Sequence, residues 1–316
     1  MECIAMITSV ATETKTIRVL YGQEQTYSIV KDNTIDLYLK IPVLGQQNIE
    51  DLISQSGKIY QDSDFYLFET EDKLVGTLIK DISFPLEKDA YEIYHNLLRL
   101  TKDWNFFRIC NYVPYIIGET SGLENYQSYC KGRSLAFEEF YGSDLDNKLP
   151  SATAVGINDN KLCIYFVAGK QKAVHVENPE QVSASSYPKE YGPKAPSFAR
   201  GTLTFQGGKR IGYLSGTASV KGHESVGIND ITKQIYTTVD NMGLVFEVLG
   251  FGRGIPDPSK YNRTFKVYIK NEVDTTIVQE LTQKLFNAEE KDIVYLHSDI
   301  CRSELLIEIE GLIEEK

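Results

Sequence analysis

The chain has 316 residues, 42% of them hydrophobic and 24% charged, so it can bury a sizeable core and is not expected to be disordered. Its formal net charge of −11 argues against sequence-independent nucleic-acid binding, which needs clustered cations, but a locally positive pocket could still hold a small anion. No segment reaches the ~20 apolar residues of a membrane span, and the N-terminal stretch MECIAMITSVATETK lacks the basic start and long apolar run of a secretion signal.

The first half predicts a small β extension followed by an α+β unit. The segments TIRVLYG and TIDLYLKIP indicate an N-terminal sheet portion. The unit itself follows from hydrophobic periodicity and turn residues. Its expected elements are a hairpin of strands 65–68 and 74–79, a helix over 88–100, a strand over 106–113, a helix over 123–140 that ends at Gly142, and strands over 152–155 and 162–168.

A connector, residues 175–199, separates this unit from the next. It contains four of the ten prolines, and Tyr187 and Tyr191 are interleaved with Lys189 and Lys194. Proline and glycine exclude a long helix here, and bulky aromatics are unusual in a flexible linker. We therefore expect an ordered loop that lines a cleft between two units.

The second half repeats the order of elements predicted for the first. We expect a hairpin of strands 201–205 and 210–215 around Gly207-Gly208, a helix from Ile231 to Leu249 capped by Asn229 or Asp230, a strand over 264–269, a helix over 276–285 and a last strand over 305–309. The predicted fold class is α+β, with two β-β-α-β-α-β units packed together. The expected boundaries are residues 1–174, the connector, and residues 200–316.

The cysteines and histidines indicate a reduced protein without a metal. The five cysteines are odd in number and form no CxxC pair, and the four histidines are isolated from one another. We expect free thiols in a cytoplasmic protein, with no metal and no other cofactor. Because two internal units could satisfy an interface that single-unit proteins make between subunits, we favour a monomer.

Several motifs together resemble one enzyme family. They are NYVP at 111–114, ENY at 124–126, CKGR at 130–133, LPSA at 149–152, HVENPEQV and YPKEYGPKAPSFAR in and after the connector, and SGTASVKGHES from Ser215. This set is similar to the chorismatases, which remove pyruvate from chorismate and were once described as pteridine-dependent dioxygenases. The resemblance runs from about residue 60 to the C-terminus and implies YjgF/RidA-like units with a cleft between them.

The resemblance implies a site for a small molecule with two carboxylates. Arginine suits each carboxylate because its planar fork donates two hydrogen bonds at once, and the matching positions are Arg133 and Arg200. Tyr187 and Tyr191 would add phenolic hydrogen bonds and an apolar wall. Gly216 and Thr217 would donate further backbone and hydroxyl hydrogen bonds. The alternative for each arginine is an ordinary surface position, and for each tyrosine it is loop packing.

Cleavage of the enol ether needs a proton on its methylene carbon. A carboxylic acid whose pKa is raised by burial can supply it, and Glu308 matches the family position of the catalytic glutamate. Alternation places Glu308 on the face of the last strand opposite Leu305, Ile307 and Ile309. If that face were solvated, Glu308 would be an ordinary exposed residue.

Two positions bear on the product. Cys301 matches the branch of the family in which the ring hydroxyl displaces the enolpyruvyl group and the ring aromatises to 3-hydroxybenzoate. Ala218, in SGTAS, is instead typical of the branch in which water attacks and gives a trans-dihydroxycyclohexadiene carboxylate. We favour 3-hydroxybenzoate, with 4-hydroxybenzoate as an accompanying product of a related group. Cys301 and Glu308 are seven residues apart, so a turn near Arg302-Ser303 must intervene if both line one pocket.

Two alternatives stay open at this stage. The chain could be the hydrolytic chorismate enzyme, which an analysis of the ring product would identify. It could also be a RidA-like binding protein that does not turn over chorismate. Loss of the connector motif would favour the binding protein, but that motif is intact.

Overall fold

The protein is described from a computed structural model, and the description is confined to residues 13–316. Cys3 and most of the stretch analysed for a secretion signal lie outside the described residues. Among residues 13–316, no helix is long and apolar enough to cross a membrane.

The N-terminal extension forms a separate four-stranded sheet. Its order is β2-β3-β1-β4, and β1 runs parallel to β3. The inward residues of β1 and β3, such as Ile17 and Leu37, are fully buried against the next sheet. The strands are β1 (Thr14–Leu20), β2 (Tyr27–Lys31), β3 (Thr34–Tyr38) and β4 (Ile49–Ser56).

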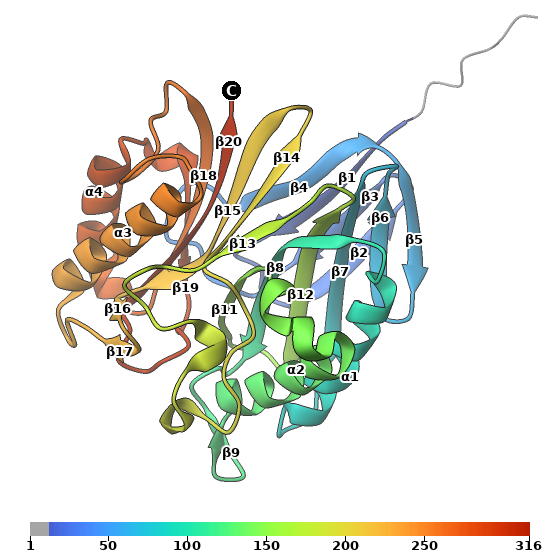
Figure 1. Cartoon of the computed structure of the whole chain (residues 1–316), viewed down its shortest axis with the longest axis horizontal. Helices are drawn as coiled ribbons and strands as arrows, with labels where there is room; N and C mark the ends of the chain where they lie inside the picture. Colours follow the sequence, from blue (N-terminus) through green and yellow to red (C-terminus); the bar gives the residue numbers. More distant parts are fainter. Residues whose placement is uncertain (1–12) are drawn as a thin grey trace, which may run out of the picture.

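The N-terminal unit is a six-stranded sheet covered by two helices on one face (Figure 1). Its strand order is β11-β8-β12-β7-β6-β5, with β11 and β8 parallel. Its elements are β5 (Lys58–Asp62), β6 (Phe65–Glu69), β7 (Lys73–Asp81), α1 (Glu87–Leu100), β8 (Asn105–Pro114), the short pair β9 (Glu119–Thr120) and β10 (Leu123–Glu124), α2 (Asn125–Tyr141), the 3-10 turn η1 (Gly142–Asn147), β11 (Ser151–Ile157) and β12 (Lys161–Gly169).

The C-terminal unit repeats this plan. Its sheet has the order β13-β14-β15-β20-β18-β19, with β18 and β19 parallel, and α3 and α4 cover its outer face (Figure 1). Its elements are β13 (Val174–Val176), β14 (Gly201–Gln206), β15 (Lys209–Ala218), the short pair β16 (Val220–Lys221) and β17 (Glu224–Ser225), α3 (Ile231–Val248), β18 (Tyr261–Ile269), the 3-10 turn η4 (Glu272–Asp274), α4 (Thr275–Phe286), the 3-10 turn η5 (Glu290–Asp292), β19 (Ile293–His297) and β20 (Ile307–Glu315).

The two sheets have one topology. When the strands of each unit are numbered along the chain, both sheets read 1-2-3-6-4-5, and strands 4 and 5 are parallel in both. This agreement confirms the predicted α+β class with two related units and a β extension. The local signals also hold: Gly207 and Gly208 both have positive φ in their hairpin, and the Asp230 carboxylate accepts the Lys233 backbone N–H at the start of α3.

Several details differ from the sequence prediction. In each unit the strands of the main sheet and the helices follow the order β-β-β-α-β-α-β-β rather than β-β-α-β-α-β, and strand β5 was not predicted. The C-terminal sheet begins at Val174, so the first residues of the connector belong to edge strand β13. Strand β19 was not predicted because its five residues show no alternation. The last strand begins at Ile307 rather than Leu305 and continues to Glu315. Its length was underestimated because the alternating glutamates resemble the solvated end of a strand.

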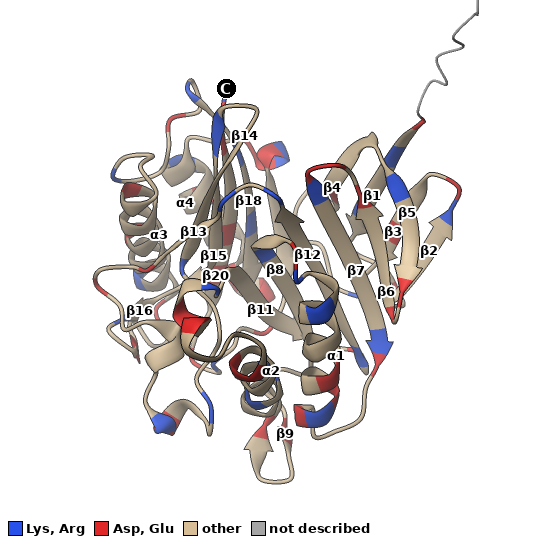
Figure 2. Ribbon diagram, turned by 45° about the vertical axis from the view of Figure 1, so that its right-hand side comes forward, with Lys and Arg blue, Asp and Glu red and all other residues tan. Residues whose placement is uncertain are grey.

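The inner faces of the sheets enclose a charged cluster. Lys266 Nζ lies 2.7 Å from Glu50 and 2.5 Å from Glu310, and Arg108 Nη2 lies 2.5 Å from Glu310. Figure 2 shows charged positions on these central strands as well as on the outer helices. Because Glu310 is fully buried, its charge is compensated by two cations rather than by water.

Candidate active site

A cavity of about 210 Å³ lies where the two units and the connector meet. Its walls come from α2 and β11 of the N-terminal unit, from β15 and β20 of the C-terminal unit, from the connector, and from the turn that contains Cys301. The end of the connector follows the edge of β11, where Ala199 forms a parallel bridge with Ser151. Ser134 on α2 holds the connector through the Ala195 carbonyl and the Ser197 hydroxyl. The connector is thus an ordered wall of the cavity.

Glu308 lines the cavity from β20 and is 4% exposed. Its strand is central, so β15 and β18 flank it at Ala218 and Tyr268. Burial raises the pKa of Glu308 to about 8, with an added rise from Glu310 and an opposing effect of Arg200. The solvated alternative for this strand face is therefore wrong, and Glu308 holds a proton at neutral pH.

Glu310 lies two residues further along the same strand face and stays ionised. Burial alone would raise the pKa of Glu310, but Arg108 and Lys266 outweigh that effect and lower it. Thr153 donates a hydrogen bond to Glu310 and accepts one from the Gly216 backbone N–H at 3.0 Å. A fixed negative charge therefore lies behind the protonated acid.

Gly216 provides the space that Glu308 occupies. A Cβ atom at this position would lie 2.0 Å from Glu308 Oε1, a distance that no side chain allows. Its backbone N–H is already bonded to Thr153 and so does not serve the expected role of donor to a ligand. Thr217 does not line the cavity, and its hydroxyl donates to the Ser215 carbonyl at 2.9 Å. The hydroxyl expected to bind substrate there is thus committed elsewhere.

Two buried arginines line the cavity, Arg133 from α2 and Arg200 from the residue directly before β14. Arg133, on α2, is 2% exposed and lies over the rings of Tyr94 and Phe137. Among residues 13–316, its Nε and Nη2 atoms have no hydrogen-bond partner. Arg200 is 5% exposed and donates from Nη2 to the Tyr187 hydroxyl at 2.7 Å. Buried guanidinium donors without partners are the groups that a carboxylate ligand would satisfy.

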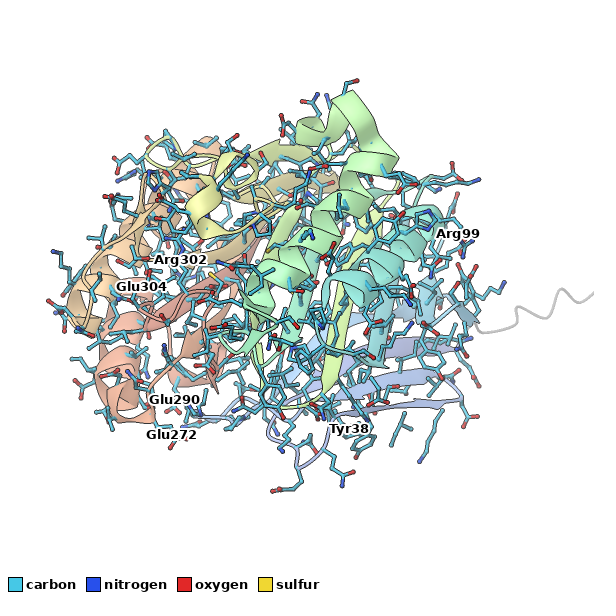
Figure 3. The ribbon with its side chains drawn as sticks, turned by 90° about the horizontal axis from the view of Figure 1, so that it is seen from below. Tyr38, Arg99, Glu272, Glu290, Arg302 and Glu304 are labelled. Atoms are coloured by element: carbon cyan, nitrogen blue, oxygen red, sulfur yellow. The ribbon has the colours of Figure 1, made fainter. Side chains whose placement is uncertain are left out.

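Tyr187 and Tyr191 close the cavity from the connector, with ring centroids 5.6 Å apart. Arg302, a residue that the sequence analysis did not select, lies 4.0 Å from the Tyr191 ring and donates to the His223 carbonyl at 2.8 Å. Figure 3 labels Arg302 and Glu304, which belong to the turn before β20. No local motif marked Arg302, because the residues it contacts, Tyr191 and His223, lie far from it in the chain.

Cys301 and Ala218 both line the cavity. A turn over residues 301–304 precedes β20, with the Leu305 backbone N–H bonded to the Arg302 carbonyl, so the predicted turn between Cys301 and Glu308 is present. Burial raises the pKa of the Cys301 thiol, and Glu308 raises it further, so the thiol is neutral. Ala152, Ala154, Ala218 and Val220 make much of the remaining wall apolar.

The described part of the chain contains no group of three or more metal-ligating side chains. The four described cysteines are free thiols. The arrangement is therefore a partly apolar cavity with one protonated acid, two phenols and two arginines that each keep at least one donor atom without a partner among the described residues.

Comparison with known proteins gives consistent matches. The N-terminal domain of FkbO/Hyg5-like chorismatases matches residues 54–168. A 3-hydroxybenzoate synthase of Streptomyces hygroscopicus is 36% identical over 232 residues, which are 70% of this chain and 67% of that protein. A chorismatase of Streptomyces rapamycinicus is 31% identical over 68% of this chain and 64% of its own length. These alignments thus span about two thirds of the relatives' length.

One solved structure matches nearly the whole chain. It is a crystal structure of a chorismatase, with 26% sequence identity and a TM-score of 0.84. The match covers 97% of this chain and 95% of that one.

Proposed function

The chain belongs to the chorismatase family, and on that basis we propose that it cleaves the enolpyruvyl ether of chorismate to give pyruvate and 3-hydroxybenzoate. The observation that carries the proposal is Glu308, a buried acid with a pKa of about 8 in the same cavity as Arg133 and Arg200. The name of the 36%-identical relative supports the aromatic product.

We propose that each arginine binds one carboxylate of the substrate. Chorismate carries a ring carboxylate and an enolpyruvyl carboxylate, and both guanidinium groups belong to residues that line the cavity. Unpartnered donors on Arg133 and the fixed position of Arg200 beside Tyr187 suit bidentate binding. Tyr187 and Tyr191 complete the wall over the ring. Binding at both ends would hold the ether next to Glu308.

Glu308 then donates its proton to the methylene carbon of the enolpyruvyl group. The ether carbon becomes an oxocarbenium-like centre, and the bond between the ring carbon and the ether oxygen weakens. The neighbouring ring hydroxyl displaces pyruvate from the ring and gives its proton back to the Glu308 carboxylate. The epoxide so formed then isomerises to 3-hydroxybenzoate. The atoms of chorismate equal those of pyruvate plus 3-hydroxybenzoate, so no water and no redox cofactor enter the balance.

Product analysis tests this proposal. The purified chain is incubated with chorismate, pyruvate is measured with a coupled assay, and the ring product is identified by chromatography. Pyruvate with 3-hydroxybenzoate, with or without 4-hydroxybenzoate, supports the proposal. Pyruvate with a non-aromatic diol supports the hydrolytic enzyme, which Ala218 favours. If no pyruvate is released, the result supports the alternative of a ligand-binding protein that does not turn over chorismate.

Cys301 offers a sharper test of the product. The neutral thiol fills space beside Glu308 where a water would have to lie for hydrolysis. We expect Cys301→Ala to release pyruvate and to shift the ring products toward the diol. Cys163→Ala is the matched control, because Cys163 is a buried free thiol outside the cavity. A diol fraction that rises equally in both variants contradicts the role assigned to Cys301.

Two further proposals concern the whole molecule. We propose that the chain acts as a monomer, since the two units and the extension bury their inner faces against one another. We also propose a cytoplasmic location, in keeping with the free cysteines among the described residues.

A further inference from the structure

A second carboxyl group lies next to the site, on Glu177 at the start of the connector. Its Oε2 atom is 3.9 Å from Nε of Arg200, too far for a hydrogen bond. Within residues 13–316, neither of these two buried atoms has a hydrogen-bond partner. Glu177 does not line the cavity, whereas Arg200 does, so Glu177 approaches the guanidinium group from outside the cavity.

Few charged groups surround this carboxyl. Arg200 is its cation, and Asp146, from the turn after α2, is a second negative charge. His175, two residues earlier, bonds to the Thr202 hydroxyl at 3.0 Å, and burial lowers the pKa of His175 to about 4, so this ring is neutral. Burial raises the pKa of Glu177 to about 7, against the effect of Arg200 and with a further rise from Asp146. Glu177 therefore changes its charge near neutral pH.

We infer that Glu177 controls how much of the positive charge of Arg200 acts on an anionic substrate, so that substrate binding drives Glu177 into its protonated form. An ionised Glu177 offsets the charge of Arg200 and also repels a carboxylate bound on the other side of it. A protonated Glu177 does neither. The proton comes from solvent, which reaches this side chain because it is 38% exposed.

The inference rests on the proposed function, because it needs a substrate carboxylate at Arg200. Linkage makes the effect reciprocal: if protonation of Glu177 strengthens substrate binding, substrate binding raises the affinity of Glu177 for its proton. Glu177 touches no reacting atom in this account. It is a positioning residue that acts through Arg200.

The test compares Glu177→Gln with the wild-type chain in chorismate turnover at pH 6 and pH 8. Glutamine has the shape of glutamate but stays neutral, like protonated Glu177. We expect equal KM values at pH 6. At pH 8 the variant should have a KM lower by several-fold, about tenfold at most, because a group with a pKa of about 7 is then mostly ionised in the wild type. The kcat values should agree within about twofold.

Glu180→Gln is the matched control. Glu180 is another carboxylate of the connector, and it pairs with Lys221 at 2.5 Å instead of with Arg200. Its KM should equal that of the wild type at both pH values. A purely structural role for Glu177 predicts a higher KM or a lower kcat for Glu177→Gln. Either of these results, or a KM that is unchanged at pH 8, overturns the inference but leaves the proposed function intact. Absence of pyruvate release by the wild type overturns the proposed function and the inference with it.

Discussion

The two units share one topology, but the equivalent edge of the sheet is covered differently in each. The edge strand is β11 in the N-terminal unit and β19 in the C-terminal unit. Beside β11, the connector contacts the strand at Ser151, through the bridge from Ala199. The next residues of β11, from Ala152 to Ala154, line the cavity instead. Beside β19, residues 42–44 close the edge directly: the Leu44 N–H bonds to the Tyr295 carbonyl, and Val43 forms a bridge with Leu296.

The central strands of the two units also differ, in the residues they carry on their faces. Strand β12 carries apolar and aromatic residues on both faces, such as Ile164 and Tyr165. The equivalent strand β20 places Ile307 and Ile309 toward its helices and Glu308 and Glu310 toward the other unit. One copy of the repeat thus supplies the acid, and the other supplies α2 with Arg133 and the edge along which the connector runs. The site depends on this difference rather than on the shared fold.

Of the changes that test this difference, replacing the acid Glu308 should reduce activity most. Glu308→Gln keeps the shape of the side chain but holds no transferable proton, and we expect kcat for pyruvate release to fall by about 10²- to 10⁴-fold. The measurement is steady-state pyruvate release from chorismate. Glu314→Gln, on the same strand but outside the cavity, should retain wild-type kcat. Pyruvate release by Glu308→Gln at the wild-type rate would mean that another group is the acid.

Displacing the acid should have a smaller effect than removing it. In Gly216→Ala the new methyl would meet Glu308 Oε1, so the carboxyl must shift, and we expect kcat to fall by roughly 10²-fold. The same assay measures the loss, and thermal unfolding checks that the variant is folded. A folded Gly216→Ala protein with wild-type kcat would contradict the close packing of these two residues.

The pH dependence should show an acid with a raised pKa. Glu308 acts in its protonated form, so kcat, which the charge of Glu177 should not affect, is expected to be level below the Glu308 pKa of about 8 and to fall by about tenfold per pH unit above it. The sign follows from burial, which disfavours the ionised form. A pH–rate profile from pH 6 to pH 10 measures this. Activity that rises through pH 8 would instead indicate a base.

The sequence predicted the helices and strands better than it predicted which strands are neighbours in the sheets. Hydrophobic periodicity gave all four helices described, together with the hairpins of β6 with β7 and of β14 with β15, since these signals are local. It missed β19 because this strand is a continuous buried run without alternation. It missed the length of β20 because the glutamates that alternate along it resemble solvated positions, although Glu308 and Glu310 are buried. The order of strands in the sheets depends on long-range packing, which no local pattern contains.

The same limit applies to the site. Resemblance selected Glu308, Arg133 and Arg200, and the structure places all three at one cavity. It also selected Thr217, whose hydroxyl is bonded to the Ser215 carbonyl, because a motif does not say which way each side chain points. Arg302 and Thr153 were missed, since their importance comes from contacts with residues far away in the chain.

The smallest effect on activity should come from the closed edge at β19. Leu44 packs against the core of the C-terminal unit next to this edge, on a segment that does not line the cavity. We expect Leu44→Ala to lower the free energy of unfolding by about 1–2 kcal/mol, because a half-buried side chain loses part of its apolar contacts. Chemical denaturation measures this loss, and kcat and KM for chorismate should not change. If instead Leu44→Ala impaired turnover as strongly as it impaired stability, the two edges would be mechanically coupled, and the division between an edge that is closed for stability and an edge that is opened for chemistry would be wrong.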